Sequence, residues 1–162
     1  MQAFFDKCRK TEVAQAEEFS RQFDVTLEKL PNIPGESGDY VVTKGSYPKF
    51  PEGTIIEFKF DKTSLKTGNI FLEFEQTRDC WFSTKESGIK KALSQNQIVV
   101  ITIPTNTGSG SYLLKDITDY DMLVASSHRT CTTRSGSNGN HNGCYTRGHL
   151  VCVKYLEPLE SY

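Results

Sequence analysis

The segment Thr54–Asp61 alternates strictly between two kinds of side chain, and this pattern strongly limits how the chain can fold. Successive side chains of a β-strand point to opposite faces, so the pattern predicts a strand with one face in a core. The other face would carry Glu57, Lys59 and Asp61 together. A fold built around this segment therefore needs a sheet with a charged row near its surface.

A second alternating segment, Asn69–Glu75, follows after a short polar link through Thr67 and Gly68. Two such segments predict an antiparallel hairpin, which would bring Glu73 and Glu75 beside Glu57. Four acids on one small face repel one another unless a cation offsets their charge. Mg²⁺ and Mn²⁺ prefer oxygen ligands and use one or two protein carboxylates with water. A solvated polar face is the other interpretation of the same pattern.

The remaining pattern predicts an α/β (α+β) protein with a mixed sheet flanked by helices. Residues 2–23 have the apolar spacing of an amphipathic helix, and Glu12 falls within its apolar stripe. Ile98–Ile103 is a β-branched run typical of a buried central strand, and Gly88–Gln95 is expected to be a short helix after Ser87. Loops are expected over Thr105–Ser111 and residues 135–143.

Three motifs occur in order along the chain and resemble a known family. They are Glu57-Phe58-Lys59-Phe60-Asp61, the stretch Thr67-Gly68-Asn69 to Glu73-Phe74-Glu75, and Ser87-Gly88-Ile89. With Asp39 upstream, they resemble the PD-(D/E)XK nuclease superfamily, in particular its small phage-type members with E-x-K-x-D, T-G-N-x-x-[IV]-E and S-G-I motifs. The match covers about a third of the chain.

This resemblance implies a restriction-endonuclease-like core with a metal site where two strands diverge. It implies a Mg²⁺- or Mn²⁺-dependent endonuclease that hydrolyses phosphodiester bonds of DNA. Structure-selective cleavage of the junction-resolvase kind and a phage-associated role are both compatible with it. Asp39 and Glu57 would bind the metal, Lys59 would position water or steady charge, and Glu12 is the candidate for an additional ligand. The chain departs from the signature at Gly38, where the family has proline.

A competing assignment takes Asp61 as the first acid and Glu73-x-Glu75 as a variant triad without lysine. Asp39, Glu57 and Lys59 are preferred, because Asp61 and Glu73 would lie at opposite ends of the expected hairpin. Asp61, Glu73 and Glu75 remain candidates for a second ion or for orienting the first ligands.

The C-terminal part of the chain is basic and holds all three histidines. Residues 122–156 carry no acid, and together with the nuclease resemblance this favours contact with DNA phosphates. A surface loop that lacks acids is the other interpretation. The candidate DNA-binding residues are Lys90, Lys91, Arg129, Arg134 and Arg147. Two H-x-x-C pairs also suit Zn²⁺, with His128, Cys131, His141 and Cys144 as candidate ligands. The range 128–149 is therefore expected to be a basic or zinc-binding loop insertion in one domain, 1–162.

Composition restricts the other classes of function. Lys and Arg number 19 and Asp and Glu number 20, so the formal net charge of −1 excludes a uniformly basic nucleic-acid binder. No apolar run is long enough for a membrane span, and five cysteines without a secretory signal predict a cytoplasmic protein. A homodimer would suit cleavage of two strands. The alternative function is a non-catalytic DNA-binding or protein-interaction module on the same fold.

Overall fold

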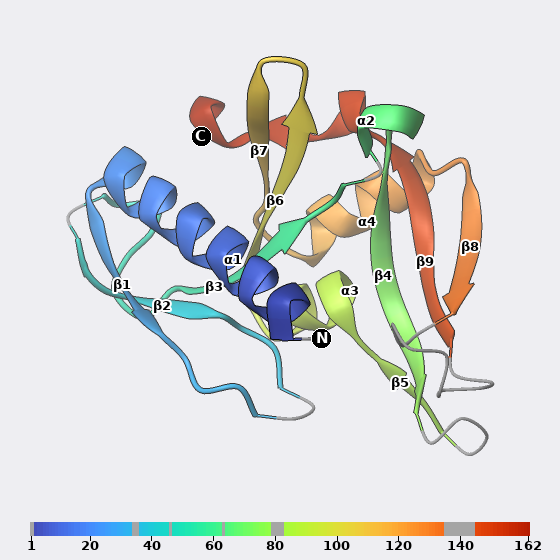
Figure 1. Ribbon diagram of the computed structural model, residues 1–162, viewed down its shortest axis with the longest axis horizontal. Helices are drawn as coiled ribbons and strands as arrows, with labels where there is room; N and C mark the ends of the chain where they lie inside the picture. The colour runs from blue at the N-terminus through green and yellow to red at the C-terminus, as the bar shows by residue number, and fades with distance from the viewer. Residues whose placement is uncertain (1, 34–35, 46, 63, 79–82, 135–144) are drawn as a thin grey trace.

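The computed structural model describes residues 2–33, 36–45, 47–62, 64–78, 83–134 and 145–162 (Figure 1). Its α-helices are α1 (Gln2–Phe23), α2 (Ser64–Thr67), α3 (Gly88–Ser94) and α4 (Ile117–Ala125). Its strands are β1 (Val25–Lys29), β2 (Tyr40–Gly45), β3 (Ile55–Phe60), β4 (Asn69–Arg78), β5 (Ser83–Glu86), β6 (Ile98–Thr105), β7 (Gly108–Leu114), β8 (Arg129–Arg134), β9 (Tyr145–Cys152) and β10 (Glu157–Pro158). Short 3-10 turns occupy Val153–Tyr155 and Leu159–Ser161.

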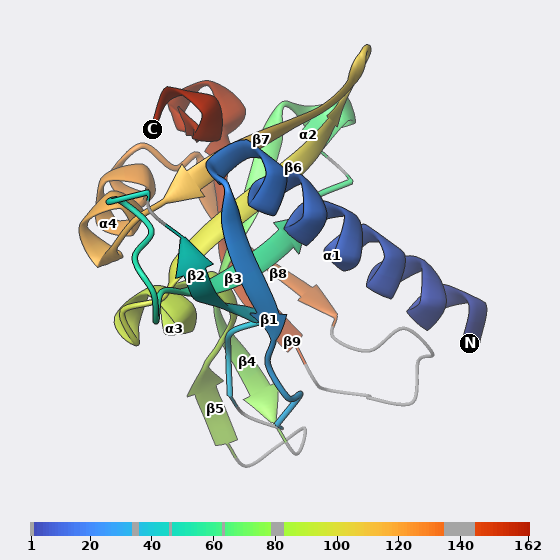
Figure 2. The same cartoon turned by 90° about the vertical axis from the view of Figure 1, so that its left-hand side faces the viewer.

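A six-stranded mixed sheet in the order β1-β2-β3-β6-β7-β10 forms the centre of the protein. Strands β3 and β6 run parallel, and the other neighbouring pairs of this sheet are antiparallel. Helix α1 covers one face, and α3 and α4 lie on the other (Figure 2). The prediction of a mixed sheet flanked by helices is thereby confirmed.

Strand β6 is buried on both faces because each face of the sheet has its own core. Val100 packs with Phe19, Phe50 and Phe58 on the α1 side. Its neighbours Val99 and Ile101, with Ile103, pack on the other side against apolar residues of α3 and α4. A strand covered on both faces reads as a continuous apolar run, so the prediction of a buried central strand at Ile98–Ile103 is confirmed.

Helix α1 has the bounds expected from its apolar spacing. Ala16, Phe19 and Phe23 are buried against the sheet, and Phe19 and Phe23 contact Phe50. Burial of this stripe fixes the rotation of the helix and so decides where its polar side chains lie. Among the described residues, no helix combines the length and the apolar composition that crossing a bilayer requires.

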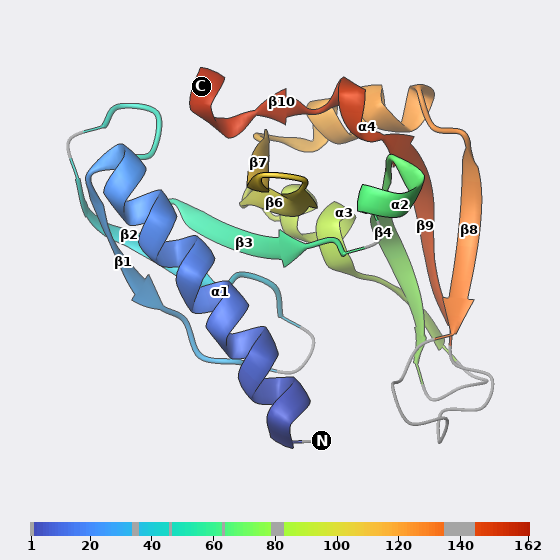
Figure 3. The same cartoon turned by 45° about the horizontal axis from the view of Figure 1, so that its top comes forward.

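The second sheet, in the order β5-β4-β9-β8, corrects the expected hairpin (Figure 3). Strands β3 and β4 do not pair: β3 has β2 on one edge and β6 on the other, while β4 pairs with β5 and β9. The alternation identified both strands correctly, but it specifies faces and not partners. The short link through α2 instead carries the chain from one sheet to the other.

Two expected loops contain strands. Strand β7 begins at Gly108, inside the range Thr105–Ser111, and pairs with β6 as far as Thr105. The range 128–149 contains β8 and the first part of β9, which pair antiparallel from Arg129 to Leu150. Gly, Ser and Thr have weak strand signals of their own, so the pairing partner decides these segments. Residues 135–144 lie outside the described residues.

Strands β2 and β3 separate close to Asp39 and Glu57. They pair only through Tyr40 with Ile56 and Val41 with Ile55. Beyond this point β3 continues beside β6 to Phe60, while the chain before β2 turns toward β1, where the Leu30 amide donates to the Asp39 carbonyl at 2.9 Å. Side chains at the point where β2 and β3 separate lie between two backbone segments and border a cavity.

Candidate metal centre

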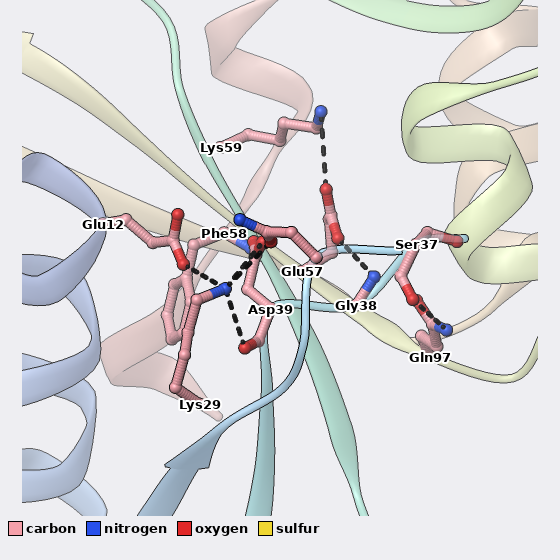
Figure 4. Close-up of polar contacts among 10 residues, drawn as sticks. Glu12, Lys29, Ser37, Gly38, Asp39, Glu57, Phe58, Lys59 and Gln97 are labelled. Atoms are coloured by element: carbon pink, nitrogen blue, oxygen red, sulfur yellow. Dashed lines mark hydrogen bonds and ion pairs between the residues drawn. The ribbon is translucent and has the colours of Figure 1, made fainter. Parts of the chain in front are cut away.

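Asp39 and Glu57 lie together where β2 and β3 separate, as their spacing predicts (Figure 4). The backbone amide of Gly38 donates to Glu57 Oε2 at 2.6 Å, and that of Phe58 donates to Asp39 Oδ2 at 2.7 Å. Each segment thus holds the carboxylate of the other through one oxygen. The second oxygen of each carboxylate faces a lysine: Asp39 Oδ1 faces Lys29, and Glu57 Oε1 faces Lys59.

Gly38 is required by this arrangement, which explains why proline does not precede the acid. Its φ of +106° lies in a region that proline cannot adopt and other L-residues rarely adopt, and its N–H is the donor to Glu57. A Cβ at this position would lie 2.7 Å from Ile55 Cγ2. The position therefore needs a residue with an amide hydrogen and without a side chain.

We expect Gly38→Ala to destabilise the protein by about 2 kcal/mol, because it adds both backbone strain and a collision with Ile55. Thermal unfolding measures this effect. The matched control is Gly53→Ala, since Gly53 has a φ of +92° but its Cβ would meet nothing within 4 Å. If the two variants lose equal stability, contact with Ile55 adds nothing at Gly38.

Glu12 and Lys29 complete the site on the side of α1. Lys29 Nζ lies 2.8 Å from Glu12 Oε1 and 3.9 Å from Asp39 Oδ1. Helix α1 thus places Glu12 beside Asp39, where its position on the apolar stripe predicted it. Lys29 was not identified from the sequence, because a single lysine at the end of a polar strand resembles any solvated residue.

The environment of Asp39 disfavours its negative charge. Burial raises the pKa of Asp39, repulsion from Glu57 and Glu12 raises it further, and the Phe58 amide and Lys29 oppose the rise, so that the pKa is about 6. The Asp39 side chain is only 17% exposed. A carboxylate in this state gains more from a nearby cation than a solvated one does.

Lys59 lies beside Glu57 and not beside Asp39. Its Nζ is 3.5 Å from Glu57 Oε1, and its side chain is 37% exposed, so its amino group can reach a group bound near Glu57. Its parallel neighbour across the pair is Ile101, and both residues border a cavity of about 140 Å³. The Lys59 ammonium group is positioned to contact an anionic group that enters this cavity.

The residues present fit a hard divalent cation. Asp39 and Glu57 offer carboxylate oxygens from two rigid segments, and their charge repulsion is relieved when a cation binds. Within the described ranges, no three His, Cys, Asp or Glu side chains form a metal-binding group. Water ligands are usual for Mg²⁺, which keeps several of them in proteins.

A larger cavity adjoins Asp39 and Glu57. It measures about 700 Å³ and is bordered by residues 30–33 and 36–39 and by Gln97. Gln97 is 6% exposed and its Nε2 donates to the Ser37 carbonyl at 3.1 Å, which holds this segment against the start of β6. No pattern in the sequence pointed to Gln97, because its role depends on a contact between distant segments. The cavity leaves open space next to the carboxylates.

Asp61 and Glu73 lie closer together than the expected hairpin implied. Both border the same 140 Å³ cavity as Lys59. Asp61 accepts hydrogen bonds from the amides of Ser64 at 3.2 Å and Phe71 at 3.0 Å, so it fastens α2 and β4. Glu73 packs on Gly88, where a Cβ would lie 2.7 Å from Glu73 Cδ. This contact joins the second and third sequence motifs.

The other acid of the competing triad, Glu75, is turned away from this cavity. It forms an ion pair of 2.6 Å with Arg147, and a bulge in the β4–β9 pairing separates it from Glu73. The structure therefore brings Asp61 and Glu73 near Lys59 but engages Glu75 elsewhere. The preferred candidates remain Asp39 and Glu57, which backbone amides anchor, and Lys59, which forms an ion pair with Glu57.

The predicted basic residues lie on the second sheet and on α3. Arg129 is exposed on β8, and Arg147 on β9 is engaged with Glu75 and with the ring of Phe74. Lys90 and Lys91 lie in α3 and are partly exposed. Arg134 ends β8, and its side chain is outside the described part.

Two of the four predicted zinc ligands lie within the described residues. His128 is exposed just before β8, and Cys131 lies in β8 opposite Gly148. His141 and Cys144 fall outside the described residues. The zinc hypothesis thus stays a prediction from spacing.

The geometry joins two anchored carboxylates, a third acid from α1 and two lysines at the end of the β2–β3 pairing. Such a set can bind a divalent cation and hold an anionic group next to it. Comparisons of the chain with protein-family models, with curated proteins and with solved structures found no match.

Proposed function

We propose that the protein is a metal-dependent DNA endonuclease with a restriction-endonuclease-like core. The observation that carries this proposal is the reciprocal anchoring of Asp39 and Glu57, with the Lys59 amino group 3.5 Å from Glu57. The mixed sheet, with the acids where two strands diverge, agrees with the fold that the sequence motifs imply. Exposed Arg129 and partly exposed Lys90 and Lys91 support an anionic polymer as substrate.

Each residue has a role that follows from its contacts. Asp39 and Glu57 would hold a divalent cation, which when bound polarises the phosphate and lowers the pKa of water. Lys59 would orient the attacking water beside Glu57 and offset charge that develops on the phosphate oxygens. The water oxygen forms the new bond to phosphorus as the bond to the leaving sugar oxygen breaks. The proton lost by water passes to solvent, and the leaving oxygen takes a proton from solvent.

A cleavage assay tests this proposal on supercoiled, four-way-branched and single-stranded DNA with Mg²⁺ or Mn²⁺. We expect cleavage that chelator abolishes and that Glu57→Gln lowers about 1,000-fold, because the neutral amide is a poor metal ligand. The control is Glu52→Gln, an exposed acid in the turn before β3. Absence of cleavage on all three DNAs with both ions would refute the proposal. Salt-sensitive DNA binding without cleavage would instead favour a binding module.

A further inference from the structure

The amino group of Lys29 occupies an oxygen-lined position between α1 and the start of β2. Glu12 Oε1 lies 2.8 Å from its Nζ, the Asp39 carbonyl lies at 3.3 Å and Asn32 Oδ1 at 3.4 Å. Asp39 Oδ1 is at 3.9 Å, and the centroid of the Tyr40 ring at 5.3 Å. Figure 4 shows this nitrogen between the carboxylates of Glu12 and Asp39.

These neighbours are the groups that bind a hard cation. Two carboxylates, a backbone carbonyl and an amide oxygen are all ligands used for divalent ions in proteins. Here they surround an ammonium group that the chain itself supplies. Glu12 Oε1 is buried, although the Glu12 side chain as a whole is 28% exposed, and Lys29 is the cation that faces this oxygen.

The charges of the site also favour a single added ion. Among the groups that form ion pairs around Lys29 and Lys59, Glu12, Asp39 and Glu57 carry three negative charges and the two lysines carry two positive charges; Asp61 and Glu73 lie on the far side of Lys59 from Lys29. One divalent ion more than offsets the remaining negative charge. A second divalent ion would have to approach a site that is already positive, next to the Lys29 ammonium.

We propose that Lys29 is a positioning residue that takes the place of a second metal ion and so restricts the site to one divalent ion. This inference rests on the proposed function, because it assumes that Asp39 and Glu57 bind the first ion. Lys29 pairs with Glu12 Oε1 and faces Asp39 Oδ1. Glu57 and Asp39 Oδ2 would then be left to bind the metal ion.

Calorimetric titration of the full chain with Mn²⁺ counts the bound ions directly. We expect one ion in the wild type and two in Lys29→Met, whose side chain has similar length without charge. Lys29→Arg keeps the charge and should bind one. The matched control Lys44→Met removes an exposed lysine from the neighbouring strand β2 and should also bind one. A purely structural role of Lys29 would not change the number of ions.

A second neutral variant guards against loss of the fold. Lys29→Gln retains hydrogen-bonding capacity toward Asn32 and the Asp39 carbonyl, and it should also bind two ions; thermal unfolding verifies that each variant is folded. One ion in both folded neutral variants, or two ions in the wild type, would overturn the inference and leave the proposed function standing. Failure of the wild type to bind any Mn²⁺ would overturn the proposed function itself.

Discussion

Replacing Lys59 with methionine is expected to lower the rate of DNA cleavage by about 100- to 1,000-fold while metal binding persists. The Lys59 amino group lies 3.5 Å from Glu57 Oε1, so it can act on a bound water or phosphate, yet it is not a metal ligand. Methionine keeps the length of the apolar stem and removes only the charge. Single-turnover cleavage at saturating Mn²⁺ measures the rate, and calorimetry measures Mn²⁺ affinity.

The two readouts separate catalysis from metal binding. Affinity for Mn²⁺ should stay the same or increase, because a positive charge next to Glu57 has been removed. Lys44→Met, at an exposed position near the end of β2, provides the control for a general loss of positive charge. A Lys59→Met variant that keeps more than a tenth of the wild-type rate would show that Lys59 has no part in the chemistry.

Asp39→Asn is expected to abolish metal binding and yet to stabilise the metal-free protein above neutral pH. Burial and repulsion by neighbouring acids raise the pKa of Asp39 from its ordinary 3.8 to about 6 in the folded protein. Folding therefore favours the protonated side chain, and its stabilising contribution is complete below pH 4 and lost as the pH rises through 6. Asparagine stays neutral at every pH and can still accept from the Phe58 amide.

The expected gain is about 2 kcal/mol at pH 8, which corresponds to a rise of roughly 4–8 °C in the melting temperature. Melting curves of wild type and Asp39→Asn should coincide near pH 4 and diverge through pH 6. A bound cation offsets the same repulsion, so Mg²⁺ should raise the melting temperature of the wild type and leave Asp39→Asn unchanged.

Asp61→Asn is the matched control for the stability effect. The Asp61 carboxylate accepts two backbone hydrogen bonds, and an amide offers only one acceptor atom, so this variant should lose stability at every pH. If Asp39→Asn is no more stable than the wild type at pH 8, burial and repulsion do not destabilise the ionised Asp39 carboxylate in the folded protein.

Local pattern sufficed for the elements whose environment is set by their own sequence. The alternation at Thr54–Asp61 and the apolar run at Ile98–Ile103 predicted β3 and β6, because each face of these strands has a fixed environment. The predicted pairing of β3 with β4 was wrong, because β3 takes a parallel partner, β6, that follows about 40 residues later in the chain. No local signal distinguishes that partner from the nearer β4.

The site residues that could be predicted are those whose positions follow from where strands begin and end. Asp39 and Glu57 meet because β2 and β3 pair antiparallel, and Glu12 joins them because the helix stripe fixes its direction. Lys29 and Gln97 could not be found this way. Each acts through contacts across distant segments, and neither belongs to a spacing pattern.

The contact between Glu73 and Gly88 restricts which pairs of residues this fold can accept at the two positions. The Glu73 side chain fills the space that a Cβ at 88 would need, and Gly88 has a φ of +62°. A larger residue at 88 therefore requires a smaller one at 73 and must also adopt the left-handed backbone conformation, as asparagine does. Relatives of this chain should therefore show covariation in side-chain size between these two positions. The same coupling would hold in the laboratory: a library randomised at both positions should return glycine at 88 wherever glutamate stays at 73.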